Sequence, residues 1–419
     1  MLISIFFILG LVRPILASAF QLNCTIPPES ASFVRGANVR GTLDILWTSL
    51  FTLFTCCWTV QHLNIPRQVQ RPTWLEGSND IWRKRVIYSH QLMKFYFFKA
   101  WPKIKWTLLT LVIPEVLVGK ALEEWYLAKK SVGEFKFLAQ ELGEDFRWIE
   151  KHWTTTHGFY ANMGGFVLKV KCKGELHDLP LNCMALRENC RNPRKIGLSR
   201  LKIPRITDEE INDKSKCDLL IKVITIGQLV WFVIQIAVRG TRGLAISELE
   251  IAVLAYAACT VFVFFLCLSK PKDIRIGLGP LPNDAVMPYS HTRNHVVVGN
   301  YVFYHIDIGC TIAGVVFGGI HCAAWGSHFP TPTDQFLWQI ASVCTTSLLP
   351  MITLCKMMDF DNPEDVKIIH YFLSTLMLLL YLLYIITRLY LVVEVFRTLY
   401  FLPSSAFVAT WTSEIPHIA

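Results

Sequence analysis

The chain has 419 residues, of which 53% are hydrophobic and 17% charged, and its mean hydropathy is positive. This balance argues against a soluble protein of two or three domains and is typical of a chain partly surrounded by lipid. The formal charge of +9 would suit a nucleic-acid partner, but the basic residues lie beside apolar runs, without any nucleic-acid-binding motif. The charge therefore predicts contact with the lipid bilayer and its anionic headgroups, and no nucleic acid as a partner.

The first twenty residues, MLISIFFILGLVRPILASAF, predict a signal peptide over 1–19. Their apolar stretch is too short to span a membrane, and Ala17-Ser18-Ala19 has the small-x-small form of a cleavage site. No Lys or Arg precedes the apolar stretch, so an uncleaved anchor is the alternative. Asn23 follows in an Asn-Cys-Thr sequon, which predicts N-glycosylation of a lumenal or extracellular segment over 20–42. The expected location is a membrane of the secretory pathway, either the endoplasmic reticulum or the plasma membrane.

Six later segments are long and apolar enough to be predicted as membrane spans. They are residues 43–60, 219–238, 249–268, 309–325, 337–355 and 368–393. The last five form a predicted helical membrane bundle over 219–400, followed by a C-terminal tail over 401–419. The predicted fold class is an all-α membrane protein with six to seven transmembrane helices, a re-entrant or interfacial segment and a cytosolic insertion.

The re-entrant or short membrane helix is predicted over 104–120, where Pro114 and Glu115 interrupt an apolar run. The preceding loop over 61–103 is basic and therefore cytosolic by the positive-inside rule. Its expected membrane-surface patch consists of Arg83, Lys84, Arg85, Lys94 and Lys99. If 104–120 does not cross, the later loop that contains Lys270 and Lys272 is also cytosolic, which favours six spans over seven.

The region over 121–218 is predicted to be cytosolic and to begin with an amphipathic helix. Apolar residues recur there at steps of three and four from Leu122 to Leu142. Gly164-Gly165 predicts a turn before a short strand, and Thr207 with Glu210 predicts a capping box at the start of a helix. In the bundle, GVVFGG (314–319) supplies small residues for close helix packing.

Glu115 is the first candidate for a catalytic residue. An ionised carboxylate in the middle of a membrane costs roughly 2.5–3.5 kcal/mol, so it needs a cavity, a partner or water. His62, Asp44, Glu250 and His321 are hypothetical catalytic helpers. The alternative is that Glu115 forms an ion pair with Lys120 or another basic neighbour and that the other four are structural, most of them at span ends.

No cofactor or metal is predicted. The sequence contains no glycine-rich phosphate loop and no GxSxG or HExxH motif. Cys172, His177, Cys183 and Cys190 lack the paired spacing of a zinc site, and Cys183 with Cys190 would suit a disulfide only in a lumenal region.

Several stretches resemble a large family of uncharacterised multi-pass membrane proteins of filamentous fungi. They include RGTLDILWTSLFTLFTCCWTVQHLNIP (40–66), KWTLLTLVIPEVLVGKAL (105–122), HGFYANMGGF (157–166), DKSKCDLLIK (213–222) and ISELEIAVLAYA followed by SKPKD. The resemblance implies a fungal source and an integral membrane protein, and it places His62, Asn64 and the Pro114-Glu115 pair in the family's pattern. It implies no activity.

Three functions remain open. A scaffold, sensor or structural protein explains the charges, and its Glu115 should be paired with a cation. A membrane-embedded enzyme, such as a cyclase or a lipid- or isoprenoid-modifying enzyme, would use Glu115 as acid or base beside a closed cavity for a small apolar ligand. A transporter or channel would need a polar route, for which Glu115, Gln228 and Gln235 are candidates.

Overall fold

The structure is a computed structural model that describes residues 39–65, 81–143, 147–172, 175–191, 203, 205–213, 218–272, 301–360 and 367–410. The chain forms two compact units, Met1–Val39 and Arg40–Ala419, and the second is described here. The predicted signal peptide and Asn23 lie outside the described residues, as do the side chains of Arg83, Lys84 and Arg85.

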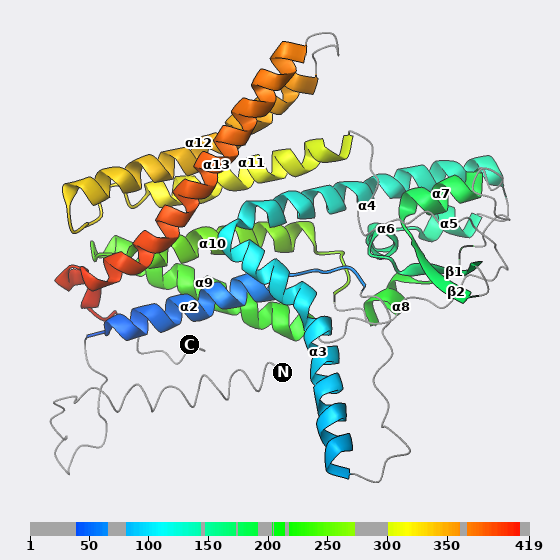
Figure 1. The fold of residues 1–419 in the computed structure, drawn as a ribbon, viewed down its shortest axis with the longest axis horizontal. Coiled ribbons are helices and arrows are strands. Elements are labelled where there is room, and N and C mark those ends of the chain that lie inside the picture. Colours follow the sequence, from blue (N-terminus) through cyan, green and yellow to red (C-terminus); the bar gives the residue numbers. More distant parts are fainter. Residues whose placement is uncertain are drawn as a thin grey trace. The chain divides into compact units, whose positions relative to one another are not determined.

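Helices make up most of the second unit (Figure 1). The longer ones are α2 (Thr42–Thr59), α3 (Ile81–Val112), α4 (Pro114–Leu142), α9 (Asp218–Thr241), α10 (Glu248–Leu266), α11 (Tyr301–Cys322), α12 (Pro332–Phe360) and α13 (Lys367–Arg397). In the part of the chain that the structure describes, five segments are long and apolar enough to cross a membrane, and they lie in α9 to α13. These five candidate spans among the described residues are fewer than the six to seven spanning helices predicted.

The predicted span over 43–60 is not among these five segments, and most of it lies in α2. With 18 residues, α2 is about 27 Å long, slightly less than the hydrocarbon thickness of a bilayer. Five threonines, one serine and Asp44 also dilute its apolar residues. Ser49 and Thr52 are buried, so part of this polar content faces other helices.

The segment over 104–120 is divided between two long helices. α3 ends at Val112 and α4 begins at Pro114, with Ile113 as the N-cap of α4. Proline has no backbone N–H and its ring collides with a carbonyl of the preceding turn, so it kinks or breaks a helix, and here α3 ends before it. Proline is well suited to the first position of a new helix, and the two helices meet at an angle in Figure 1.

The bundle packs around α10, the most buried of the five membrane-type helices. α10 packs against α2, α4 and α11, and α11 packs against α4 and α12. Glycines permit these close approaches: a Cβ atom on Gly309 of α11 would lie 2.6 Å from Cα of Gly119 in α4, and one on Gly318 would lie 2.3 Å from Oγ1 of Thr346 in α12. The predicted packing role of the glycines in 314–319 is confirmed for Gly318.

The C-terminal half of α4 packs against α5, α6 and α7 and shares a core with a small group of elements outside the five membrane-type helices. They are α5 (Arg147–His152), α6 (Thr155–Asn162), the antiparallel strands β1 (Phe166–Cys172) and β2 (Glu175–Leu181), α7 (Cys183–Arg191) and α8 (Asp208–Asp213). Phe135 of α4 stacks on Trp153, with ring centroids 4.1 Å apart, in the core that joins them. Gly164 has φ +84°, which supplies the predicted turn before β1. Thr207 and Glu210 form the predicted capping box.

Two arginines hold the segment after α13, which contains the short 3-10 helices η3 (Thr398–Tyr400) and η4 (Ser404–Phe407). Arg239 of α9 is 2% exposed and donates hydrogen bonds to the carbonyls of Ser405, Ala406 and Val408. Arg40, just before α2, donates to the carbonyl of Ala406 and forms an ion pair with Glu250 at 2.6 Å. This segment is therefore tied to the beginning of α2 and the end of α9.

Candidate functional site: two buried polar clusters

The first cluster forms where α3 ends and α4 begins. Because α3 stops there, the carbonyls of Leu111 and Val112 need partners from outside the helix. The hydroxyl of Tyr256 in α10 donates to the carbonyl of Leu111. The guanidinium of Arg388 in α13 donates to the carbonyl of Val112, from Nη2 at 3.1 Å and from Nε at 3.3 Å. Two distant helices thus satisfy the carbonyls that the proline break exposes.

Glu115 is fully buried in the first turn of α4, where the helix dipole favours a negative charge. Its Oε1 lies 3.9 Å from Nη1 of Arg388, which is itself 2% exposed. The guanidinium also lies over the ring of Phe317, 3.8 Å from its centroid. Glu115 is therefore paired with an arginine, while Lys120, the neighbour considered from the sequence, pairs with Glu124 at 3.7 Å.

His321 belongs to the same cluster through Phe317. The two rings stack with centroids 4.5 Å apart, and Nδ1 of His321 hydrogen bonds with the carbonyl of Phe317 at 2.8 Å. The indole of Trp338 donates to the backbone carbonyl of His321 at 3.3 Å. His321 is 1% exposed, and these contacts fix its ring in the core between α11 and α12.

Some polar atoms of this cluster lack hydrogen bonds among the described residues. They are both carboxylate oxygens of Glu115 and the hydroxyl of Tyr384, which interacts electrostatically with Glu115. A small cavity beside Pro114 and Tyr256 offers about 10 Å³ to the centre of a water-sized sphere. That is room for about one water molecule.

The second cluster lies at the C-terminal end of α2, where helix carbonyls again need donors. Lys272 donates to the carbonyl of Thr59 at 2.6 Å, and Lys270 donates to the carbonyl of His62 at 2.6 Å. Lys270 also pairs with Glu124 of α4 at 2.7 Å. Both lysines follow α10 and are at most 3% exposed, so the cluster holds cations that are shielded from solvent.

The electrostatics of this cluster follow from burial and from the charges of its lysines. Burial lowers the pKa of His62 well below its usual value, and the charges of Lys270 and Lys272 lower it further. Burial would raise the pKa of Glu124, but attraction by Lys270 and Lys120 outweighs that effect and the pKa is lowered. His62 is therefore neutral at neutral pH and Glu124 is ionised.

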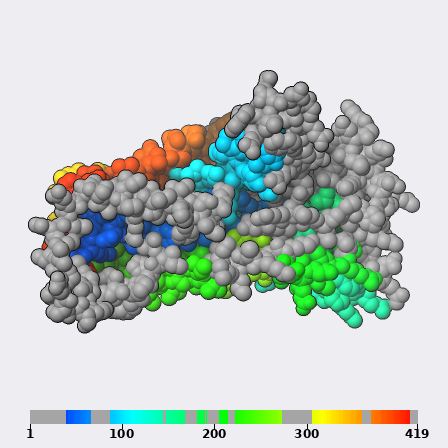
Figure 2. All heavy atoms as spheres, turned by 90° about the horizontal axis from the view of Figure 1, so that it is seen from below, coloured from blue at the N-terminus to red at the C-terminus, as the bar shows by residue number. Residues whose placement is uncertain are grey.

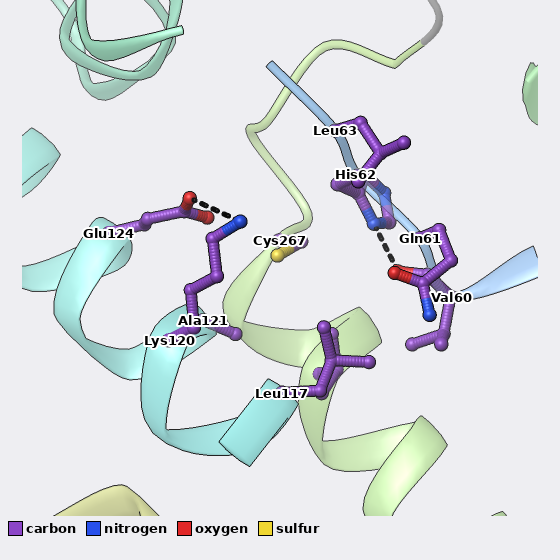
Figure 3. A pocket seen from close by; sticks show the side chains of 10 residues that line it. Val60, Gln61, His62, Leu63, Leu117, Lys120, Ala121, Glu124 and Cys267 are labelled. Carbon is purple, nitrogen blue, oxygen red and sulfur yellow. Dashed lines mark hydrogen bonds and ion pairs between the residues drawn. The ribbon is translucent and has the colours of Figure 1, made fainter. Parts of the chain in front are cut away.

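A second small cavity lies among these residues (Figure 3). Its lining includes Gln61, His62, Lys120, Glu124 and Cys267, and it too offers about 10 Å³ to the centre of a water-sized sphere. Nε2 of His62 and Oε1 of Gln61 are buried without a hydrogen-bond partner among the described residues.

The five sequence candidates do not come together. Glu115 and His321 share the first cluster, whereas His62 lies in the second. Asp44 is exposed and accepts a hydrogen bond from the backbone N–H of Gly41 at 2.9 Å, which caps α2. Glu250 forms a capping box with Ser247 and pairs with Arg40. Among the residues that the structure describes, neither Asp44 nor Glu250 forms a hydrogen bond or an ion pair with Glu115.

The described part of the predicted basic patch lies on α3. Lys94 and Lys99 are exposed, and large apolar side chains of the same helix are exposed beside them, namely Met93, Tyr96, Phe97, Phe98 and Trp101. Figure 2 shows part of α3, in cyan, at the surface of this face.

Cysteine and metal chemistry receive no support from the described residues, among which no group of three or more His, Cys, Asp or Glu could hold a metal ion. Cys183 and Cys190 are buried and form no disulfide. Burial raises the pKa of Cys183 to about 12, which keeps it a thiol.

The residues that sequence reasoning missed are those that complete each cluster. Arg388 was not singled out from the sequence, although an arginine within an apolar helix is itself a sign of a buried partner. Lys270 and Lys272 were used only to predict on which side of the membrane their loop lies. Nothing in their local sequence shows that their side chains are buried.

Comparisons with known proteins add one match. Residues 98–279, less than half of the chain, match the model of a family of unknown function (DUF8562). No curated protein and no solved structure matches the chain. The match is compatible with the resemblance to an uncharacterised family, while the fungal source stays a prediction. Glu115, Lys120, Glu124 and Lys270 lie inside the matched range, whereas His62 and Arg388 lie outside it.

Proposed function

We propose that this protein is a multi-pass membrane scaffold or sensor, in which Glu115 and Arg388 form a structural pair rather than a catalytic one. The observation that carries the proposal is that the carboxylate of Glu115 is fully buried and lies 3.9 Å from the buried guanidinium of Arg388. The same guanidinium donates a hydrogen bond to the carbonyl of Val112, at the break between α3 and α4. The adjoining cavity holds about one water molecule, which is far smaller than the few hundred Å³ of a typical ligand pocket.

The membrane-facing part of the proposal rests on α3. Aromatic residues favour the interface of a bilayer, and lysines among them favour an anionic leaflet. Lys99 lies 5.7 Å from the ring centroid of Phe95, and Lys103 lies 4.8 Å from that of Trp58. We expect α3 to lie at the cytosolic surface of a secretory-pathway membrane, with Asn23 on the opposite side.

The test is a deletion strain of the source organism, for which we propose a filamentous fungus. It is complemented with wild type, Glu115→Gln or Arg242→Gln, the last being an exposed arginine that serves as the control. Organic extracts and protein abundance are measured together. A scaffold predicts extracts that do not change at matched abundance, and lower abundance or stability for Glu115→Gln alone.

A second candidate function is a membrane-embedded enzyme that uses Glu115 as acid or base. The oxygens of Glu115 and Tyr384, which lack hydrogen bonds among the described residues, favour it, because such buried polar atoms occur where a substrate or water enters. The decisive result would be a compound that disappears on deletion and returns with wild type but not with Glu115→Gln at equal abundance. It would favour this enzyme over the scaffold. For a transporter the support is weaker, since Gln228 donates to Thr52 of α2 and so joins two helices.

A further inference from the structure

A histidine connects two helices of the group around the C-terminal half of α4. His157 lies in the first turn of α6, within the stretch HGFYANMGGF, and Asp208 is the first residue of α8. Nδ1 of His157 lies 3.1 Å from Oδ1 of Asp208. The histidine side chain is 1% exposed and the aspartate side chain 40%. A buried imidazole therefore contacts a carboxylate that solvent reaches.

The contacts of this ring determine which protons it can carry. Nε2 lies 2.8 Å from the carbonyl of Ile206, which can only accept, so Nε2 carries a proton. Nδ1 has neighbours of both kinds. The backbone N–H of Thr154 donates to it at 3.2 Å, whereas the carboxylate of Asp208 can only accept. Nδ1 of His157 therefore has a hydrogen-bond partner both with and without a proton.

The two protonation states of the ring hold Asp208 differently. When the ring is neutral, Nδ1 accepts from the backbone of Thr154, and the carboxylate is held by the hydroxyl of Thr154, which donates to Oδ1 at 2.6 Å. When the ring is protonated, Nδ1 donates to Asp208 and the two groups carry opposite charges. Such charge-assisted hydrogen bonds are about twice as strong as neutral ones. Protonation of His157 therefore strengthens the attachment of α8 to α6.

α6 is the fixed side of this contact. A Cβ atom on Gly158 would lie 2.7 Å from the carbonyl oxygen of Ala128, so α6 lies directly against α4. The ring of Trp153 stacks on that of His157, with centroids 5.4 Å apart. α8, by contrast, is a helix of six residues that shortly precedes the membrane-type helix α9. A change at the contact between His157 and Asp208 therefore acts on α8 and on the segment that leads to α9.

We propose that His157 and Asp208 form a proton-dependent contact, which holds α8 firmly on α6 when the ring is protonated and weakly when the ring is neutral. Histidine is the side chain whose charge ordinarily changes between pH 5 and 8. The stronger contact is present at the acidic end of this range and is lost as pH rises. As a signal for the sensor proposed above, proton concentration rests on that proposed function. The contact itself does not involve Glu115 or Arg388, so either proposal can fail without the other.

Other charged or titratable side chains lie on the elements around α6. They are Lys130 and Glu134 of α4, His152 of α5, Cys183 and Arg187 of α7, and Glu209, Glu210 and Asp213 of α8. Among the described residues, Asp208 alone forms an ion pair with His157. His152 is exposed and is the other histidine of this group, with Nδ1 2.9 Å from the carbonyl of Trp148. It is therefore the residue whose titration must be separated from that of His157.

The test is amide hydrogen exchange of the full chain, purified in a nonionic detergent, at pH 6 and pH 8. Exchange rates over residues 205–213 are divided by the intrinsic rates of the same amides at each pH, so that only protection is compared. We expect about three- to tenfold greater protection at pH 6, as for one charge-assisted hydrogen bond to a partly exposed partner. Protection in α10 should change little. Equal protection of 205–213 at the two pH values would overturn the proposal.

The partner of the ring is tested with Asp208→Asn, and its matched control is Glu209→Gln, at the next and exposed position of α8. Asparagine has the size of aspartate but no charge, so the difference between pH 6 and pH 8 should largely disappear in Asp208→Asn. It should persist in Glu209→Gln. A difference that stays in Asp208→Asn, or that is lost in Glu209→Gln, contradicts the contact.

Two histidine variants identify the ring that titrates. His157→Gln should abolish the difference between the two pH values, because glutamine takes up no proton, and His152→Gln should keep it. If His157→Gln does not fold, Asp208→Asn and His152→Gln still decide, since both change side chains that solvent reaches. Loss of the difference in His152→Gln would assign the response to the exposed ring, and the proposal would be wrong.

Discussion

Arg388 contacts two consecutive parts of the α3–α4 break: its Nη2 donates to the carbonyl of Val112 at 3.1 Å, and its Nη1 lies 3.9 Å from Oε1 of Glu115. The carbonyl belongs to the last turn of α3 and the carboxylate to the first turn of α4. One guanidinium from α13 therefore balances the negative groups on both sides of Pro114.

Arg388→Met should destabilise the protein by about 3–5 kcal/mol, because it leaves Glu115 buried without a countercharge and the carbonyl of Val112 without its donor. The double variant Glu115→Leu/Arg388→Met should recover part of that loss, since no charge then remains buried. Denaturant unfolding in detergent measures both, with Arg242→Gln as the exposed control. Additive losses in the double variant would mean that the two side chains do not interact.

Gly309→Ala should destabilise the contact between α4 and α11, because its new Cβ would lie 2.6 Å from Cα of Gly119. Overpacking of this kind costs about 1–3 kcal/mol. Gly319→Ala on the same helix is the matched control, since a Cβ there meets nothing within 4 Å. This control should be neutral or slightly stabilising, as alanine is the better helix former. Thermal unfolding of both variants checks the difference, and equal melting temperatures would place this helix contact elsewhere.

Arg239→Gln should loosen the segment around η4, since Arg239 donates to three carbonyls between Ser405 and Val408. Amide hydrogen exchange over residues 401–410 should become faster, while exchange in α10 should change little. Arg242→Gln, three residues later and exposed, serves as the control. Unchanged exchange in Arg239→Gln would show that other contacts suffice to hold the segment.

Glu123 should make stability depend on pH. Burial raises its pKa from 4.5 to about 7, and the neighbouring charge of Glu124 adds to the rise. A carboxyl group with a raised folded-state pKa favours the folded state most below the unfolded pKa, and this contribution is lost as pH rises through the folded value. Glu123→Gln should therefore gain stability relative to wild type between about pH 4.5 and 7, and the difference should stay constant above pH 7.

The measurement for Glu123 is the melting temperature of both proteins over that pH range. The comparison with Gln is needed because His62, with a lowered pKa, acts in the opposite direction: its stabilising contribution is lost as pH falls below 6.5. A constant difference between wild type and Glu123→Gln would show that Glu123 titrates normally.

Local features of the fold could be predicted because their causes are local. The three- and four-residue spacing from Leu122 to Leu142 lies in α4, the Gly164 turn precedes β1, and Thr207 with Glu210 caps α8. Each rests on a contact between residues close in sequence. The break at Pro114 belongs to the same class, since proline itself ends α3.

The partners in both clusters could not be predicted, since they join residues far apart in the chain. Glu115 was singled out by its chemistry, but its pairing with Arg388 depends on how α13 packs beside α4. Lys270 and Lys272 follow α10 in a stretch whose periodicity does not distinguish an inward from an outward lysine. Fewer candidate spans than predicted occur among the described residues because α2 has the length of a marginal span while its hydroxyl groups lower its hydropathy.

α4 connects the first buried cluster to the core that it shares with α5, α6 and α7. This single helix of 29 residues is about 44 Å long. Its first turn holds Glu115 among the membrane-type helices, and its last turns carry Phe135 and Leu138 in the core shared with α5, α6 and α7. Because α4 is one continuous helix, a displacement of its first turn at the Arg388–Glu115 pair would be carried along its length to the core that it shares with α5, α6 and α7.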